Sequence, residues 1–305
     1  MENRKTGFLI LHYKDFKITD RCIASILSLK EGNQAKIIIV DNGSCNESAE
    51  QLQDKYKDNQ MIDILVLDQG YGFSRGNNIG YQYVRKHCHG LDFLVVANND
   101  IVFGQKDFIR LIEGEYRKYR FVIMGMDMID TRSGSHLNPK YKPKSEEEIR
   151  EWLVQLENLK TKRNLRRKMM YRFQQSAAYP VYVKFIRNKR PDVRKQKELS
   201  MQYADDRVLQ GGCLVFSKTF LKSEEHLFWP ETRFYCEEDL LYLRCRQNGW
   251  KILYSPRLQV WHEQGASFKA GSKSIKERIE SGIRYNTESA KILLAQMRRQ
   301  QNQKQ

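Results

Sequence analysis

Cysteine is sparse, and long hydrophobic runs are missing. The six cysteines of this 305-residue chain form no CxxC pair, so the sequence indicates neither a disulfide framework nor a structural zinc site. No stretch of eighteen apolar residues occurs, which argues against a membrane-spanning helix. Residues 1–5 are polar and lead into an apolar strand without a small-residue cleavage site. The sequence therefore predicts a cytoplasmic protein without a signal peptide.

Positive charge is abundant and unevenly distributed. The formal net charge is +16, and residues 140–200 alone hold eighteen Lys or Arg against seven Asp or Glu. Such a surplus indicates a polyanionic partner: an anionic membrane surface, a phosphorylated lipid or nucleic acid. No recognisable nucleic-acid-binding module is present, so we do not expect nucleic acid as the partner.

Strand and helix patterns alternate through the first 130 residues. This alternation predicts βαβ units, and hence an α/β fold with a mainly parallel central sheet flanked by helices. The expected strands cover residues 8–12, 36–40, 62–67, 91–97 and 121–129, and the expected helices cover residues 15–29, 47–56, 79–87 and 106–119, with a glycine-rich loop at residues 70–78.

The remainder of the chain begins with a basic segment that we interpret as a helical insertion, residues 139–206. In it, Ser145 followed by Glu148 fits a helix N-terminal cap. Regular structure is expected to resume at residues 207–216 (a strand), 237–247 (a helix), 251–254 and 258–262 (two strands separated by Pro256) and 272–305 (a polar helix with a frayed tail).

Acidic residues follow two of the predicted strands. Ligands bind beyond the carboxyl ends of parallel strands, and Asp41 and Asp100 stand at such ends. Asp100 could hold a divalent cation through its carboxylate oxygens. Asp41 could accept hydrogen bonds from a ribose or a base. For both, the alternative is that Asp and Asn simply favour a turn or a helix cap.

Three further groups could carry chemistry. Four glycines between Gly70 and Gly80 allow close backbone approach to a phosphate, and Arg75 could pair with a diphosphate or be merely exposed. The carboxylates of residues 237–239 lie among apolar neighbours, which suits a general base, or they simply complement the helix dipole. His262 could bind a metal or phosphate, or be a polar edge residue.

In order and spacing, these motifs resemble the family-2 glycosyltransferases, which have the GT-A fold. The resemblance extends over residues 6–268 apart from the insertion. The motifs are Val40-Asp41-Asn42-Gly43-Ser44, Gly72 to Gly80, Asn98-Asn99-Asp100-Ile101, Gly211-Gly212-Cys213, Phe234 to Asp239, Gly249-Trp250 and Pro256 with His262.

The resemblance implies roles for individual residues. Asp100 and His262 would bind Mn²⁺ or Mg²⁺, and Glu238 or Asp239 would deprotonate the acceptor hydroxyl. The nucleotide-sugar site would include Asp41, Asn42, Ser44, Gly72, Arg75, Asn77, Asn78, Asn98 and Asn99.

The acidic motif departs from the commoner family form, Glu-Asp-x-Asp followed by Arg and Gly. Anchoring on Arg244 and Gly249 puts Glu238 at the position of the base, and Leu240 replaces the later aspartate. We favour Glu238, with Asp239 close behind. The metal motif begins with Asn98, so Asp100 is its one carboxylate.

The resemblance also implies a domain plan. Residues 1–138 would bind the nucleotide sugar, residues 207–270 would form the acceptor-binding half of the same domain, and residues 271–305 would be a C-terminal helix and tail. The insertion, residues 139–206, lies outside the resemblance. Its basic and aromatic residues suggest docking to an anionic membrane or a lipid-linked acceptor, the alternative being a solvated helical hairpin over the active site.

The expected activity is inverting transfer of a hexosyl or rhamnosyl group from a UDP- or dTDP-sugar. The acceptor would be a lipid-linked bacterial surface glycan, such as lipopolysaccharide or capsule, at the inner face of the cytoplasmic membrane. The rival interpretations are a basic nucleic-acid- or membrane-binding protein without transferase activity, a nucleotidyltransferase and a non-catalytic scaffold. The second would need a lysine- and glycine-rich triphosphate loop near the N-terminus, which the sequence lacks.

Overall fold

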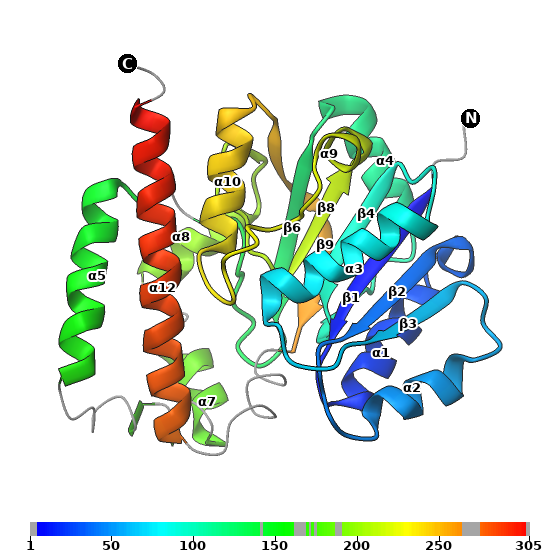
Figure 1. Ribbon diagram of the computed structural model, residues 1–305, viewed down its shortest axis with the longest axis horizontal. Coiled ribbons are helices and arrows are strands. Elements are labelled where there is room, and N and C mark those ends of the chain that lie inside the picture. Colours follow the sequence, from blue (N-terminus) through cyan, green and yellow to red (C-terminus); the bar gives the residue numbers. More distant parts are fainter. Residues whose placement is uncertain are drawn as a thin grey trace.

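The computed structural model describes residues 5–140, 143–161, 169–170, 172–173, 176–186, 191–263 and 275–302. Much of the basic run of the predicted insertion, residues 162–168, lies outside the described residues, as does the predicted boundary at residue 270. Figure 1 shows a central sheet flanked by helices, with a separate helical layer beside it.

One mostly parallel sheet organises the molecule, in the strand order β3-β2-β1-β4-β8-β6-β9-β5, with β7 pairing to β9. The first four of these strands are mutually parallel, whereas β8 runs antiparallel to both β4 and β6. The predicted α/β fold is therefore confirmed. The strands are β1 (Thr6–His12), β2 (Lys36–Asp41), β3 (Ile62–Val66), β4 (Phe93–Asn98), β5 (Ile101–Val102), β6 (Ile123–Asp130), β7 (Ala204–Asp205), β8 (Cys213–Ser217) and β9 (Ile252–His262).

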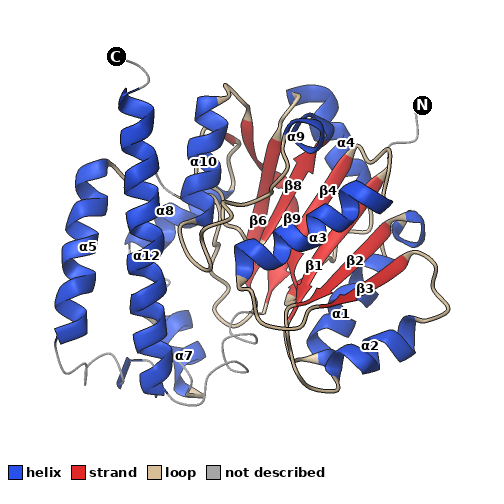
Figure 2. Ribbon diagram, viewed as in Figure 1, coloured by secondary structure: helices blue, strands red, loops and turns tan. Residues whose placement is uncertain are grey.

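Helices cover both faces of the sheet (Figure 2). On one face, the helices α1 (Phe16–Leu27), α2 (Ser48–Tyr56) and α4 (Phe108–Tyr119) contribute to one buried apolar cluster. The opposite face is covered by α3 (Phe73–His87), α9 (Lys218–Ser223) and α10 (Glu237–Gln247). A short 3₁₀ helix, η1 (Gly32–Gln34), precedes β2. Because both faces are covered, the central strands read as continuous apolar runs.

Three predicted boundaries were wrong. Helix α3 begins at Phe73, so most of the predicted glycine-rich loop is helical; Gly72, with a φ of +85°, forms its N-cap. The two short strands predicted around Pro256 are one strand, β9. Its pairing with β6 shifts register after Ser255, and a proline without an amide proton is tolerated at such an irregularity. The strand predicted at residues 207–216 begins only at Cys213, the first residue of β8.

A helical layer lies beside the sheet and includes the insertion. It contains α5 (Glu146–Thr161), α7 (Ala178–Phe185), α8 (Pro191–Ser200) and the C-terminal α12 (Ile275–Asn302). The predicted cap of α5 is confirmed: Glu148 donates its amide proton to Ser145 Oγ at 3.1 Å, and Ser145 donates to the Glu148 carboxylate. In Figure 1, α5 and α12 run side by side.

This layer packs directly on α10. Ile149 of α5 and both Ala290 and Leu293 of α12 join Cys236 and Leu240 in a buried cluster. The C-terminal helix therefore lies on the domain and supports the start of α10. Among the described residues, no helix combines the length and the apolar character needed to cross a bilayer.

The close approach of α3 to the sheet generates a stability prediction. A Cβ at Gly80 would lie 2.6 Å from side-chain atoms of both Leu9 and Val40, whereas a Cβ at Gly114 of α4 would meet nothing within 4 Å. We expect Gly80→Ala to lower the free energy of unfolding by about 1–3 kcal/mol through overpacking. Gly114→Ala is the control and should raise it by about 0.5–1 kcal/mol. Urea denaturation measures both, and equal effects would contradict this packing.

Candidate active site

Asp100 and His262 meet where β4 and β9 end. Asp100 Oδ1 lies 3.1 Å from His262 Nε2, and both side chains are less than a tenth exposed. The pairing of β5 with β9 fixes this contact, because Ile101 stands opposite His262 and Glu263 donates its amide proton to the Asp100 carbonyl at 2.9 Å. Two residues that are far apart in sequence are thus brought together as predicted.

The donor atoms of this pair fit a divalent cation. Within the described part of the chain, Asp100 Oδ1 is buried and has no hydrogen-bond partner besides its ion-pair contact with His262 Nε2, so these two facing atoms are the pair that could share a cation. No group of three or more His, Cys, Asp or Glu suited to a metal occurs among these described residues. Two protein ligands leave most coordination positions to other oxygens, as is usual where Mg²⁺ binds through one or two carboxylates plus substrate phosphates.

The rest of the triplet is anchored from two sides. Asn98 donates its amide proton to the Gly212 carbonyl at 2.9 Å, which ties the triplet to the segment before β8. Asn99 is 1% exposed and donates from Nδ2 to Thr19 Oγ1 of α1 at 2.9 Å. These bonds fix the backbone around Asp100, so the orientation of its carboxylate is determined by the fold.

Asp41 ends β2 and is 2% exposed. Ser44 donates its hydroxyl proton to Asp41 Oδ1, and its own Oγ accepts the Lys14 amide proton at 2.7 Å. His12 Nε2 lies 3.8 Å from Asp41 Oδ1. Asp41 and Ser44 therefore bond each other beside a buried histidine that the motifs did not indicate, and their predicted contact with a nucleotide sugar stays a prediction.

Asn42 and Arg75 are bonded within the chain. Asn42 donates from Nδ2 to the Gly72 carbonyl at 3.1 Å and accepts the Tyr71 amide proton at 2.9 Å. Arg75 donates from Nε to the Pro230 carbonyl at 3.0 Å. Both side chains hold backbone segments in place, and their predicted contact with a nucleotide sugar stays a prediction.

The asparagines of α3 differ from each other. Asn78 exchanges two hydrogen bonds with the backbone of Phe228, at 2.9 and 3.0 Å. Asn77 donates to the Phe73 carbonyl at 2.9 Å, but its Oδ1 is buried without a partner in the described structure. A buried amide oxygen without a partner is costly. The Asn77 oxygen is an acceptor that a ligand could use, whereas the amide oxygen and nitrogen of Asn78 both already bond Phe228.

The acidic triplet opens α10, and two lysines neighbour it. Glu238 accepts the Gly211 amide proton at 3.1 Å, and Lys140 Nζ lies 3.1 Å from its other oxygen. Lys144 Nζ lies 3.7 Å from Asp239 Oδ1. Both lysines belong to the start of the predicted insertion, so this segment contributes charge to the site.

One backbone segment, Gly211-Gly212, connects the acidic triplet at the start of α10 with the Asn98-Asn99-Asp100 triplet. Gly211 binds Glu238, and the adjacent Gly212 accepts the amide proton of Asn98. A Cβ at Gly211 would lie 3.2 Å from Glu238 Cγ, so a small residue permits this approach. Glu238 is thereby brought next to the segment that carries Asp100.

Glu237 was not predicted as a functional residue. Burial and the neighbouring Glu238 raise its pKa to about 8, and its Oε2 is buried without a hydrogen-bond partner in the described structure. Tyr235 and Cys236, just before it, have φ values of +69° and +59°. Left-handed backbone at non-glycine residues is strained and clusters at functional sites. The apolar neighbours in the sequence were the one available signal for this burial.

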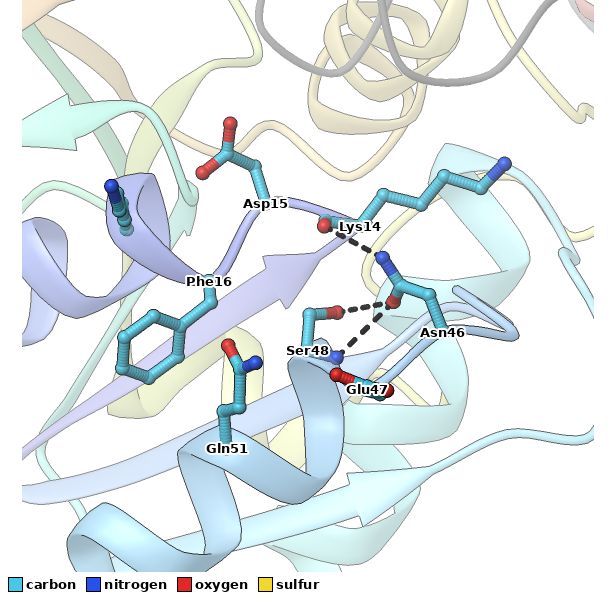
Figure 3. A pocket seen from close by; sticks show the side chains of 8 residues that line it. Lys14, Asp15, Phe16, Asn46, Glu47, Ser48 and Gln51 are labelled. Carbon is cyan, nitrogen blue, oxygen red and sulfur yellow. Dashed lines mark hydrogen bonds between the residues drawn. The ribbon is translucent and has the colours of Figure 1, made fainter.

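A cavity of about 540 Å³ opens between the starts of α1 and α2. Figure 3 shows Asn46 bonded to the Lys14 carbonyl and to Ser48 at its wall. Its lining includes residues after β1 and β2, at the carboxyl ends of the parallel strands. The residues that line it are Lys14, Asp15, Phe16, Lys17, Asn46, Glu47, Ser48 and Gln51.

The raised pKa of Glu237 predicts how stability depends on pH. Its carboxyl titrates near 4.5 when unperturbed and near 8 in the native state. Between these values the native state binds the extra proton, so the free energy of unfolding falls as pH rises. Glu237→Gln removes this contribution, so its melting temperature relative to wild type should rise by a few degrees between pH 5 and pH 8.5. Exposed Glu151→Gln is the control; identical pH dependence of all three proteins would contradict the assignment.

Similar folds occur in solved glycosyltransferases. S. aureus TarS 1–349 has a TM-score of 0.50 at 12% identity, covering 96% of this chain and 70% of that one. The same fragment in complex with UDP-GlcNAc has a TM-score of 0.51 at 12% identity, covering 95% and 70%. GalNAc-T7 with UDP, GalNAc and Mn²⁺ has a TM-score of 0.54 at 13% identity, covering 86% and 44%.

The sequence comparison is more specific. No curated protein matches the chain. The family model described as "Glycosyl transferase family 2" matches residues 8–222, which is more than half of the chain and includes β1 to β8. The mostly parallel sheet with helices on both faces agrees with this match. The chain therefore belongs to glycosyl transferase family 2 and has the GT-A fold.

Proposed function

We propose that this chain is an inverting glycosyltransferase that moves a sugar from a nucleoside diphosphate to an acceptor hydroxyl. One observation carries the proposal: Gly211 and Gly212 connect Glu238 to the triplet that contains Asp100. A carboxylate suited to activate an acceptor is therefore joined, through one short backbone segment, to the loop that carries a side chain suited to hold a diphosphate through a cation.

The reaction divides between these two groups. Glu238 takes the proton of the acceptor hydroxyl as its oxygen bonds to the anomeric carbon. The bond from that carbon to the diphosphate breaks on the opposite face, which inverts the configuration. A divalent cation held by Asp100 and His262, Mn²⁺ or Mg²⁺, would neutralise the departing diphosphate. Asn77, with its free amide oxygen, is available to position the donor.

Glu238 is favoured over Asp239 as the base. Glu238 contacts the Gly211 segment, whereas Asp239 faces Lys144 in the helical layer. Burial raises the pKa of Asp239, although Lys144 and Lys140 oppose this effect. Lys140 Nζ lies 3.1 Å from the Glu238 carboxylate.

The donor is proposed as a UDP- or dTDP-sugar carrying a hexosyl or rhamnosyl group. Support comes from two similar structures, since TarS binds UDP-GlcNAc and GalNAc-T7 contains UDP and Mn²⁺. The cavity between the starts of α1 and α2 is lined by Lys14, whose amide bonds Ser44, so it offers the nucleoside space next to one of the residues predicted to contact it.

The acceptor is proposed as a lipid-linked bacterial surface glycan, and the protein as peripheral on an anionic membrane. On α7 and just after it, Val181, Phe185 and Ile186 are each more than half exposed. The surrounding residues 140–200 carry a large excess of Lys and Arg. Exposed apolar side chains within a basic segment suit an anionic lipid surface.

Donor binding should need Asp100 and not Glu238. We expect a UDP- or dTDP-sugar with Mn²⁺ to raise the melting temperature of wild type, because a ligand that binds the native state stabilises it. Asp100→Ala should lose this metal-dependent shift. Glu238→Gln is the matched control: it should retain the shift and lose about 10²-fold or more in transfer rate.

Other outcomes contradict parts of this proposal. A panel of nucleotide sugars that stabilises neither protein, together with a salt-dependent shift on adding DNA, would replace the transferase with a nucleic-acid-binding function. A transfer rate in Glu238→Gln close to wild type would remove Glu238 as the base, and Asp239→Asn would then be measured.

Membrane contact has its own test. The protein should cosediment with phosphatidylglycerol vesicles, which are anionic, and much less with phosphatidylcholine vesicles, which carry no net charge. The measurement is made at low salt, because salt screens the attraction between charges. Phe185→Ser with Ile186→Ser should weaken this binding, whereas Val154→Ser on α5, also exposed, is the control. Equal binding to both lipids, or to neither, would argue against the proposal.

A further inference from the structure

His12 ends β1 and is completely buried, yet the proposed reaction assigns it no role. Both ring nitrogens have partners: Nδ1 lies 2.6 Å from Thr19 Oγ1, and Nε2 lies 2.8 Å from Ser48 Oγ. A strand whose other residues are apolar therefore ends in a fully bonded polar side chain. Such a residue fixes the groups around it.

Donor counting fixes the direction of one of the two bonds. Thr19 donates its hydroxyl proton to the Asp15 carbonyl at 3.1 Å, so it accepts from His12 Nδ1. On the other side, the single hydroxyl proton of Ser48 is shared between Asn46 Oδ1 at 2.6 Å and His12 Nε2 at 2.8 Å. Burial lowers the pKa of His12, while Asp41 and Asp15 raise it in part, which favours the neutral ring.

From Nδ1, the network reaches the metal triplet. Thr19 Oγ1 also accepts a proton from Asn99 Nδ2 at 2.9 Å. Since Asn99 adjoins Asp100, one hydroxyl separates His12 from the residue next to the proposed metal ligand. Thr19 is itself completely buried, so water cannot replace these bonds.

From Nε2, the network reaches the nucleotide side. Ser48 contacts Asn46 Oδ1 at 2.6 Å, and Asn46 donates to the Lys14 carbonyl at 3.0 Å (Figure 3). These three residues line the cavity between the starts of α1 and α2, and the Asp41 carboxylate lies 3.8 Å from Nε2. The imidazole thus contacts the two loops that follow β2 and β4, directly or through one hydroxyl.

We propose that His12 is a positioning residue that couples the nucleoside subsite to the metal triplet, through Ser48 on one side and Thr19 on the other. This inference rests on the proposed function of the site. Through the shared imidazole, ordering one loop by a nucleotide orders the other, so nucleoside diphosphate and Mn²⁺ bind cooperatively. The coupling is a free energy between two sites, and it is reciprocal.

Two substitutions of His12 each keep one of its two hydrogen bonds and remove the other. Asn at position 12 places its amide near Nδ1 and can keep the bond to Thr19, whereas Gln places its amide near Nε2 and can keep the bond to Ser48. UDP and dTDP are titrated calorimetrically with and without Mn²⁺. We expect His12→Gln to retain metal-free nucleotide affinity while the enhancement by Mn²⁺ falls about fivefold or more. For His12→Asn, metal-free affinity itself should fall about fivefold or more.

Further variants keep the test decisive. Where the His12 variants do not fold, Thr19→Val and Ser48→Ala break the same two bonds and should reproduce the same two patterns. Thr287→Val, which removes a buried hydroxyl bonded within α12, is the control and should bind as wild type does. Wild-type values in all four site variants would overturn the inference while leaving the proposed function intact. A wild-type protein that binds neither nucleotide would overturn both.

Discussion

The complete burial of the parallel strands determines where polar chemistry can lie. Phe8 to Ile10, Ile37 to Val40 and Phe93 to Leu94 are completely inaccessible, because helices cover both faces of the sheet. A charged group inside such a strand would be costly, so polar residues are confined to the strand ends. His12, Asp41 and Asn98 stand at three adjacent strand ends: His12 is in register with Asp41, and Asn98 is in register with Leu11, the residue before His12. The location of the proposed donor site, at the ends of the strands, follows from this confinement.

The carboxylates proposed to activate the acceptor are positioned by a helix and not by strand ends. They lie on the first turn of α10, where the helix dipole favours negative charge. The strained backbone of Tyr235 and Cys236 turns the chain into that helix. Strain persists where surrounding packing determines the conformation, and here the packing comes from α5 and α12. The insertion and the C-terminal helix therefore hold the start of α10, where the proposed base lies.

The elements that were predicted well are those with strong local signals. The apolar runs of β1, β2 and β4 left little choice, and α10 begins and ends as its acidic first turn and Asn248-Gly249 indicate. The start of α3 was wrong because glycines were taken as loop residues. Gly76 lies inside the helix, and a glycine is needed there because a Cβ would lie 2.8 Å from the Leu11 side chain. That requirement is tertiary and leaves no local pattern.

The site shows the same division. Asp100 and His262 could be predicted because motif order placed both at strand ends. The partners of the asparagines could not: Asn78 binds Phe228, 150 residues away, and Asn42 binds Gly72. The roles of Lys140 and His12 also depend on long-range contacts, with Glu238 and with Ser48. Residue type indicates which chemistry a side chain could perform, whereas the fold determines which side chains remain available for a ligand.

The packing of α12 on α10 has a consequence for synthesis. Ribosomes release a chain from its N-terminus, and early segments fold first. The strands that carry His12 and Asp41, and the turn that carries Asp100, emerge well before Ala290 and Leu293, which pack on Cys236 and Leu240. A nascent chain can thus assemble the proposed donor side early, whereas the carboxylates at the start of α10 take their final positions only after α12 has been made.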